Sequence, residues 1–261
     1  MSQGHDGINY SLAHRDAITN LVEAQANATT FDGGVFIASC DKAMPAMLMS
    51  IGRLKEMSAI VVTGGVMEAT VVKPEYVEND PGCKINELLT LEQIGKFSAQ
   101  YERGEIPEEQ LRYYKHNACP SCGACSFMGT ASTMQVMAEA LGLMLPGTAL
   151  MPATSPDLLA FAREAGRQAV RLAKMEHMRP SDIVTMESFE NAILVHAAIS
   201  GSTNCLLHLP AIAHEVGMDF DISFANSISE KTPNLCHLAP AGPTYTVSYT
   251  HLRAHETELH L

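Results

Sequence analysis

Three cysteines stand at intervals of three residues in one short stretch of the chain. Cys119, Cys122 and Cys125 belong to "HNACPSCGACSFMGTAST", which runs from His116 to Thr133. A turn of this length can direct two or three thiolates at one metal ion, and His116 is a further ligand candidate just upstream. The spacing is therefore typical of a site for a soft metal.

Two familiar metal-site patterns fit this stretch poorly. A structural zinc site normally has two ligand pairs some distance apart, and only one group is visible here. Ferredoxin spacing would place a fourth cysteine four residues after Cys125, where the chain has Gly129. A zinc-stabilised binding module that uses only His116 and the three cysteines stays open as an alternative. An electron carrier would need a fourth sulfur that the local spacing does not provide.

A second group of reactive side chains follows a short apolar run. The run "GGVFIAS" is bounded by glycine and predicts a buried strand that leads straight into Cys40, Asp41 and Lys42. In open parallel sheets, ligands gather outside the carboxyl ends of the strands, which is where these residues would lie. Taken alone, the group is also explained by a packed cysteine beside a solvated Asp–Lys pair. Joint ligation of one cluster by Cys40 and one or more of the later cysteines would explain both motifs.

The segments around the two cysteine motifs alternate between helix and strand. A helical apolar period covers residues 10–28, and the apolar run at 33–39 follows as a strand. A helix with proline in its first turn is expected at 45–57, and a second buried strand at 58–65. Strand, helix and strand form a βαβ unit with parallel pairing. The sequence thus predicts an α/β fold of three layers, a parallel sheet flanked by helices.

The rest of the chain predicts helices outside this unit. Residues 68–117 are expected to form a helical excursion from the sheet, in which "VENDPGCKIN" is a loop. Surface helices are expected within it at 90–104 and 107–115. Further helices are predicted at 130–144, 155–175, 185–200 and 205–217.

The composition limits the classes of protein to consider. The 261 residues, 46% of them apolar, suffice for one large or two modest packed domains. A net charge of -12 with only 17 Lys and Arg argues against a nucleic-acid partner, because phosphate binding needs clustered basic side chains. No membrane-length apolar run and no secretory signal occurs, so we expect a cytoplasmic protein with no membrane partner. The seven cysteines are then expected to be thiols or metal ligands rather than disulfides.

Four motifs resemble those of one enzyme family and follow the same order. They are "CDKAMPAMLMS", "CPSCGACSFMGTAST", "EALGLMLPG" and "HAAISGSTNCLLHLPAIAHE". Together they are similar to the family that joins dihydroxy-acid dehydratase to the sugar-acid (aldonate) and phosphogluconate dehydratases. The likeness runs from about Gly4 to Tyr245, and the stretch between Cys40 and Cys125 is longer than in typical members.

The resemblance implies an iron–sulfur cluster and a magnesium ion. Cys40 and Cys125 match two of the family's cluster cysteines, whereas the other two cysteines of the later stretch match none. A 2Fe-2S cluster is favoured over a 4Fe-4S cluster, with an open iron that polarises the departing 3-hydroxyl. Asp41 matches a magnesium ligand, and Lys42 matches a lysine that is carbamylated in relatives and so gains an anionic oxygen. The magnesium would hold the substrate's carboxylate and 2-hydroxyl.

The resemblance also implies a hydro-lyase that dehydrates a 2,3-dihydroxy acid to a 2-oxo acid. Dihydroxy-acid dehydratase, with a place in branched-chain amino acid biosynthesis, is the broader default. A sugar-acid dehydratase of carbohydrate acid metabolism is the alternative within the family. The partner would be a small anionic substrate, and the intact enzyme a homodimer or homotetramer.

Relatives extend beyond this sequence at both ends. Their β-rich C-terminal domain, which is absent here, carries the serine that removes the C2 proton, so no catalytic base is assigned in this chain. We expect residues 1–245 to be a partial N-terminal iron–sulfur dehydratase domain, truncated at both ends and inactive alone. Residues 246–261 follow no family pattern and are interpreted as an artefactual tail whose histidines bind no metal.

Several histidines and one polar loop admit a structural explanation. His196, His208 and His214 lie on apolar faces of predicted helices, where a hydrogen-bonded core histidine is more common than a ligand. The polar residues Ser202, Thr203 and Asn204 could contact substrate, but a helix N-cap explains them equally well.

Overall fold

Two parallel strands form the centre of the main body of the protein. The computed structural model describes residues 5–78, 88–240, 242 and 244–246. Strands β1 (Gly33–Ala38) and β2 (Ser58–Thr63) pair in parallel along their whole length. Helix α2 (Ala43–Arg53) makes the crossover between them. The predicted βαβ unit is therefore confirmed, and α2 begins two residues before the proline at which the sequence pattern placed its start.

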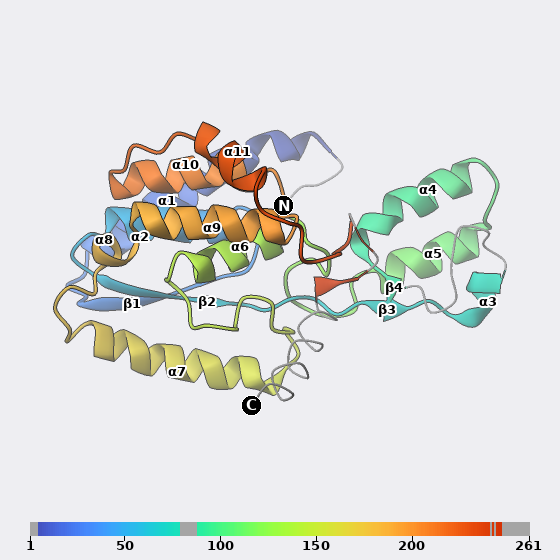
Figure 1. Cartoon of the computed structure of the whole chain (residues 1–261). Helices are drawn as coiled ribbons and strands as arrows, with labels where there is room; N and C mark the ends of the chain where they lie inside the picture. Colours follow the sequence, from blue (N-terminus) through green and yellow to red (C-terminus); the bar gives the residue numbers. More distant parts are fainter. Residues whose placement is uncertain (1–4, 79–87, 241, 243, 247–261) are drawn as a thin grey trace, which may run out of the picture.

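Helices cover both faces of this small sheet, as Figure 1 shows. One face carries α1 (Ser11–Asn27), α2, α6 (Thr130–Ala140), α9 (Met186–Ala198) and α10 (Cys205–Val216). The opposite face is covered by α7 (Pro156–Leu172). The largest apolar cluster lies on the five-helix side and includes Phe36, Leu48, Met137, Phe189 and Leu209. The three-layer α/β prediction is confirmed.

Strand β2 is held on both of its edges. On one side it pairs with β1, and on the other its Val61 amide donates to the Leu143 carbonyl at 2.7 Å. The helix predicted at 130–144 therefore ends at Ala140, because Gly142 adopts a φ of 83° and turns the chain toward β2. β2 is the more buried strand, and β1 lies at the edge of the sheet.

The predicted excursion forms a separate small cluster beside the main body (Figure 1). It contains β3 (Thr70–Val71), α3 (Pro74–Glu78), β4 (Leu88–Leu89), η2 (Leu91–Gln93), α4 (Ile94–Glu102) and α5 (Glu108–Asn117). Phe97 of α4 stacks on Tyr114 of α5 with ring centroids 3.8 Å apart, which gives the excursion its own apolar core. The first two residues of the predicted loop "VENDPGCKIN", Val77 and Glu78, belong to α3, so the loop prediction is wrong there, and the rest of it lies outside the described residues.

Four short helical segments in the described ranges have no counterpart among the predicted helices. They are η1 (Asp6–Tyr10), α3, α8 (Pro180–Ile183) and α11 (Ser223–Ser229). Of the proposed tail, residues 247–261 lie outside the described part of the chain. Across the described ranges no helix is apolar over the length that crossing a bilayer would need.

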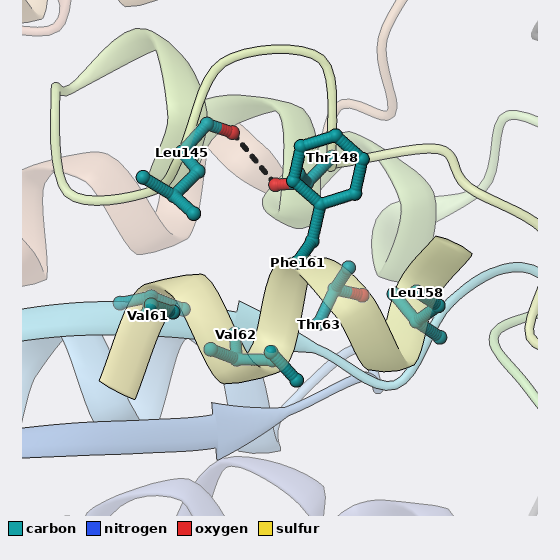
Figure 2. A pocket seen from close by; sticks show the side chains of 9 residues that line it. Val61, Val62, Thr63, Leu145, Thr148, Leu158 and Phe161 are labelled. Carbon is teal, nitrogen blue, oxygen red and sulfur yellow. Dashed lines mark hydrogen bonds between the residues drawn. The ribbon is translucent and has the colours of Figure 1, made fainter. Parts of the chain in front are cut away.

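An apolar hollow lies between β2 and α7, on the face of the sheet away from α2 (Figure 2). Val61, Val62, Leu158 and Phe161 are among its lining residues. The Thr148 hydroxyl at its rim donates to the Leu145 carbonyl at 2.7 Å. Nothing in this hollow presents a titratable side chain, so it is not the candidate site.

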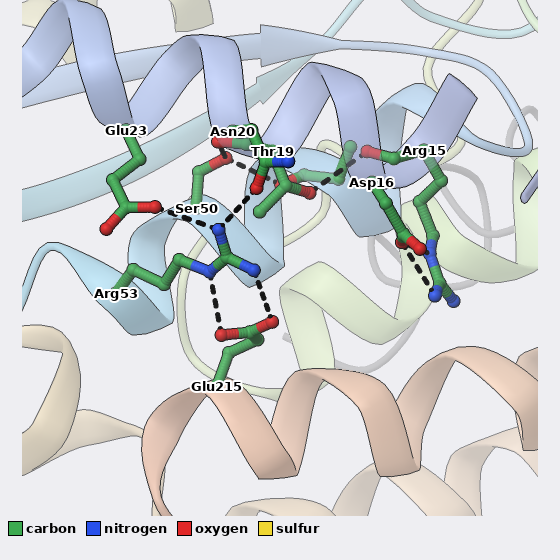
Figure 3. Close-up of polar contacts among 9 residues, drawn as sticks. Arg15, Asp16, Thr19, Asn20, Glu23, Ser50, Arg53 and Glu215 are labelled. Carbon is green, nitrogen blue, oxygen red and sulfur yellow. Dashed lines mark hydrogen bonds and ion pairs between the residues drawn. The ribbon is translucent and has the colours of Figure 1, made fainter. Parts of the chain in front are cut away.

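Arg53 at the end of α2 joins three helices (Figure 3). Its Nε and Nη2 atoms donate to the two carboxylate oxygens of Glu215 on α10, at 2.7 and 2.8 Å. Its Nη1 atom donates to Glu23 at 2.8 Å and to Asn20 at 2.7 Å, both on α1. A bidentate arginine–carboxylate pair has defined geometry. This network fixes α1 and α10 against α2, the helix that directly follows the Cys40–Lys42 segment.

Arg53→Met is expected to lower the free energy of unfolding by about 1–3 kcal/mol, because it removes charge-assisted hydrogen bonds and leaves Glu215 without its partner. Urea unfolding followed by circular dichroism measures the change. Arg112→Met is the matched control, since Arg112 and Glu108 form a pair whose side chains are 69% and 66% exposed. The control is expected to change stability by less than about 1 kcal/mol. Equal losses in both variants would contradict the assigned role of Arg53.

The same pair predicts a dependence on pH. The hydrogen bonds from Arg53 hold the pKa of Glu215 below its ordinary value of 4.5. Their contribution is therefore complete above pH 4.5 and is lost as the pH falls through the lower folded-state pKa. The stability difference between wild type and Arg53→Met should shrink below pH 4.5, which unfolding curves at several pH values would test.

Candidate metal centre

The segment Cys40–Lys42 leaves the carboxyl end of β1 and enters α2. The Cys40 carbonyl accepts a hydrogen bond from the Met44 amide at 2.9 Å, and the Lys42 carbonyl accepts one from Ala46 at 3.2 Å. The backbone of the segment is thereby fixed by the first turn of the helix. The Cys40 thiol is exposed, whereas Lys42 is buried.

Asp41 and Lys42 form an ion pair that is largely shielded from solvent. Lys42 Nζ lies 2.9 Å from Asp41 Oδ1, and the two side chains are only 10% and 13% exposed. Burial acts to raise the pKa of Asp41, but its contacts with His208 and Lys42 outweigh this and hold the pKa below 3.8. The explanation by a solvated Asp–Lys pair is therefore wrong. Asp41 is an ionised carboxylate in a sheltered place, the kind of group that hard divalent cations prefer.

The Cys125 loop is attached to the chain that continues from β2. The Ala124 amide donates to the Gly65 carbonyl at 2.8 Å, and the Met67 amide donates to the Ala124 carbonyl at 2.7 Å. Gly123 has a φ of 114°, and a Cβ there would lie 2.6 Å from the Met67 nitrogen. Only glycine allows this approach. Cys125 is therefore held near the carboxyl end of β2, beside the end of β1 that leads to Cys40.

Helix α6 joins the two thiol-bearing segments. The Ser132 hydroxyl donates to the Cys125 carbonyl at 3.2 Å, and Gln135 Nε2 donates to the Ser39 carbonyl at 3.4 Å. Burial raises the pKa of the Cys125 thiol, and the neighbouring thiols of Cys40 and Cys119 raise it further. The structure thus brings Cys40 and Cys125 to the same edge of the sheet. Their roles as cluster ligands stay a prediction.

The other candidate ligands of the later cysteine stretch differ in how near they lie to Cys125. Cys119 is exposed but near enough to affect Cys125, while His116 and Cys122 are exposed. In the described part of the chain, no three His, Cys, Asp or Glu side chains are arranged to hold one metal ion. A metal at this edge would therefore complete its coordination with other donors.

The polar loop before α10 forms hydrogen bonds with α6. The Ser202 and Thr130 hydroxyls lie 2.8 Å apart, and Asn204 Nδ2 donates to Thr130 Oγ1 at 3.0 Å. The Ser202 amide also donates to Thr133 at 3.0 Å. Asn204 stands at the N-cap of α10, but its side chain makes this contact with α6 instead of a capping bond. Thr203 is exposed.

His208, which the sequence indicated only as a core histidine, stands beside Asp41. His208 of α10 is fully buried, with Nε2 3.6 Å from Asp41 Oδ1 and Nδ1 3.2 Å from Arg15 Nη1. The interpretation of His208 as a hydrogen-bonded core histidine holds for Nδ1, yet its ring also faces the candidate site. His196 Nε2 contacts the Ser202 carbonyl at 3.0 Å, and His214 is exposed, so its core assignment is wrong.

Comparison with known proteins places the chain among dehydratases. The family model for the dihydroxy-acid/6-phosphogluconate dehydratase N-terminal domain matches residues 1–252. A relative from Caldicellulosiruptor bescii named dihydroxy-acid dehydratase is 44% identical over 93% of this chain and 41% of its own length. One of the same name from Clostridium beijerinckii is 43% identical over 94% of this chain and 42% of its own length. The chain thus spans about two fifths of the relatives it matches.

The burial of the thiols predicts an order of alkylation. Cys122 is exposed and is expected to react first with iodoacetamide at pH 8. Cys125 should react more slowly because its pKa is raised, and Cys205 slowest because burial raises its pKa to about 12. Peptide mass spectrometry over time measures the three rates. Modification of Cys205 as fast as Cys122 in folded protein would contradict the arrangement.

Proposed function

The chain belongs to the dihydroxy-acid/6-phosphogluconate dehydratase family, and on this premise we propose that it forms the metal-binding part of a hydro-lyase. The reaction is removal of water from a 2,3-dihydroxy acid to give a 2-oxo acid. The observation that carries the proposal is the gathering of Cys40, Asp41, Lys42 and Cys125 at one edge of the sheet. Residues 1–245 are proposed as part of the N-terminal domain.

Cys40 and Cys125 are the proposed ligands of an iron–sulfur cluster, with 2Fe-2S favoured. The donor set fits because both residues are thiols, the ligands that iron–sulfur clusters use, and they lie near enough for Cys40 to affect the pKa of Cys125. Burial raises the pKa of Cys125, which is a cost that a bound metal cation would have to offset. The cluster, when bound, supplies a Lewis acid for the departing 3-hydroxyl. The exposed Cys40 thiol and the half-buried Cys125 thiol would hold the cluster.

Asp41 and Lys42 are the proposed protein ligands of a magnesium ion. Asp41 fits because it is ionised and sheltered, and both of its contacts with described side chains involve Oδ1. Lys42 fits after carbamylation: its neutral amine forms a bond to the carbon of CO2 and releases one proton, which leaves an anionic oxygen ligand. The ion supplies positive charge for the carboxylate and 2-hydroxyl of an anionic substrate in a protein of net charge -12.

Dihydroxy-acid dehydratase is the favoured activity because the relatives compared above carry that name. A sugar-acid dehydratase is the alternative within the family. The intact enzyme is proposed to be a cytoplasmic homodimer or homotetramer. We propose that this chain alone has no turnover, because the proton-abstracting serine of the family matches no residue in it. Formation of a 2-oxo acid by the isolated chain would contradict this.

Metal analysis tests the ligand assignment. After anaerobic reconstitution, the chain is expected to hold iron and acid-labile sulfide, and Cys40→Ser and Cys125→Ser are each expected to lose both. Cys122→Ser is the matched control and should keep them, because that thiol is exposed and has no assigned ligand role. Cys119→Ser should also keep them.

A different outcome would favour another class of protein. If wild type and Cys40→Ser bind zinc equally well, the cluster assignment is contradicted and a zinc-stabilised binding module is supported. Loss of iron in Cys119→Ser with retention in Cys40→Ser would place the ligands within the later cysteine stretch.

A further inference from the structure

A row of polar side chains that are buried or nearly so connects α1 and α10 to the start of α2. Arg15 of α1 contacts His208 of α10, and His208 faces Asp41 immediately before α2. His208 is 0% exposed, and the side chains of Arg15 and Asp41 are 12% and 13% exposed. Ionisable groups are rarely buried together unless they are paired or hold a ligand. The row therefore needs an explanation beyond core packing.

The contact with Arg15 decides which nitrogen of His208 carries the proton. A guanidinium group only donates hydrogen bonds, so Nδ1 must accept the one from Arg15 Nη1 at 3.2 Å. A neutral imidazole that accepts at Nδ1 carries its proton on Nε2. The remaining Arg15 bonds go to Asp16, with Nε at 2.9 Å from Oδ1, which fixes the direction of the guanidinium. The structure thus directs an Nε2–H group at Asp41.

This donor has no hydrogen bond of its own within the described residues. Nε2 of His208 is buried and unpaired there, and Asp41 Oδ1 at 3.6 Å is slightly beyond hydrogen-bond range. A shift of roughly half an ångström would complete the bond. Buried donors are normally satisfied, so the ring is placed for a partner on the Asp41 side.

We propose that His208 is a positioning residue that donates Nε2–H to Asp41 Oδ1, and so orients this carboxylate for a divalent cation, while Arg15 selects the required tautomer. The inference rests on the proposed function and extends it to two residues with no assigned role. Hydrogen bonds to ligating carboxylates fix their direction and are part of the design of metal sites.

Lys42 explains why a second donor is needed. When Lys42 is an ammonium, its Nζ donates a hydrogen bond to Asp41 Oδ1 at 2.9 Å. Carbamylation would replace the ammonium by an uncharged N–H and direct an anionic oxygen to the cation. His208 then becomes the donor that keeps Oδ1 in place. The charge facing this carboxylate would come from the cation.

The tautomer is tested first, on the complete 261-residue chain without added metal. Long-range 1H–15N correlation spectra of the histidine rings are expected to show His208 protonated at Nε2 and bare at Nδ1. Arg15→Met should release this preference and give a mixture of tautomers. A proton on Nδ1 in the wild type would overturn the inference, whatever the function of the protein.

Cation binding is tested next, with Mn²⁺ as the probe and the EPR signal of free Mn²⁺ as the readout. His208→Leu removes the donor at similar volume and is expected to weaken binding by roughly 10- to 100-fold. His208→Gln keeps an amide N–H at the end of the side chain and is expected to bind Mn²⁺ close to wild type. Thermal unfolding of each variant identifies a variant that has lost its fold.

Comparison of the two His208 variants with Asp41→Asn distinguishes a failure of the positioning role of His208 from a failure of the proposed magnesium site. Mn²⁺ binding that is lost in Asp41→Asn but unchanged in folded His208→Leu would overturn the positioning role alone. Equal weakening in His208→Gln and His208→Leu would also overturn it, because the donor would then be irrelevant. Binding that is absent in wild type or unaffected by Asp41→Asn would overturn the proposed magnesium site, and this inference with it.

Discussion

The parallel pairing of β1 with β2 is the constraint on which the candidate site depends. It ends both strands at one edge of the sheet, so that the segment Cys40–Lys42 and the chain beyond Thr63 emerge side by side. The Cys125 loop pairs with that second segment, and α6 bonds to both. Strand direction therefore brings two cysteines far apart in the sequence to the same edge of the sheet, with no metal contributing to the fold.

The groups around Asp41 differ in character from the strongly acidic protein as a whole. The protein is strongly acidic, yet Asp41 faces nitrogen atoms of Lys42 and His208, and Arg15 lies on the other side of the His208 ring. Their helices are held together by Arg53, whose hydrogen bonds tie α1, α2 and α10. Stability and site geometry are thus coupled, since loosening that network would change the position of the groups around the carboxylate.

Local features of the fold were predictable from the sequence, and long-range ones were not. The βαβ unit follows from two continuous apolar runs around a helical segment, and Cys40 follows the first run directly. The end of α6 at Ala140 has a local signal in Gly142, but the pairing of the chain after it with β2 is long-range and no local pattern encodes it. The role of His208 was missed for the same reason: its partner Arg15 is 193 residues away, and its apolar neighbours resemble any buried helix face.

Strand β1 has consequences for any work on this chain alone. Within the described residues it pairs with β2 only, and its residues Val35 and Ile37 are 39% and 67% exposed. An apolar strand with open backbone groups recruits other strands from neighbouring molecules. Concentrated preparations of the isolated polypeptide are therefore prone to self-association through this edge. Dilute samples or a solubilising fusion partner are expected to reduce this association.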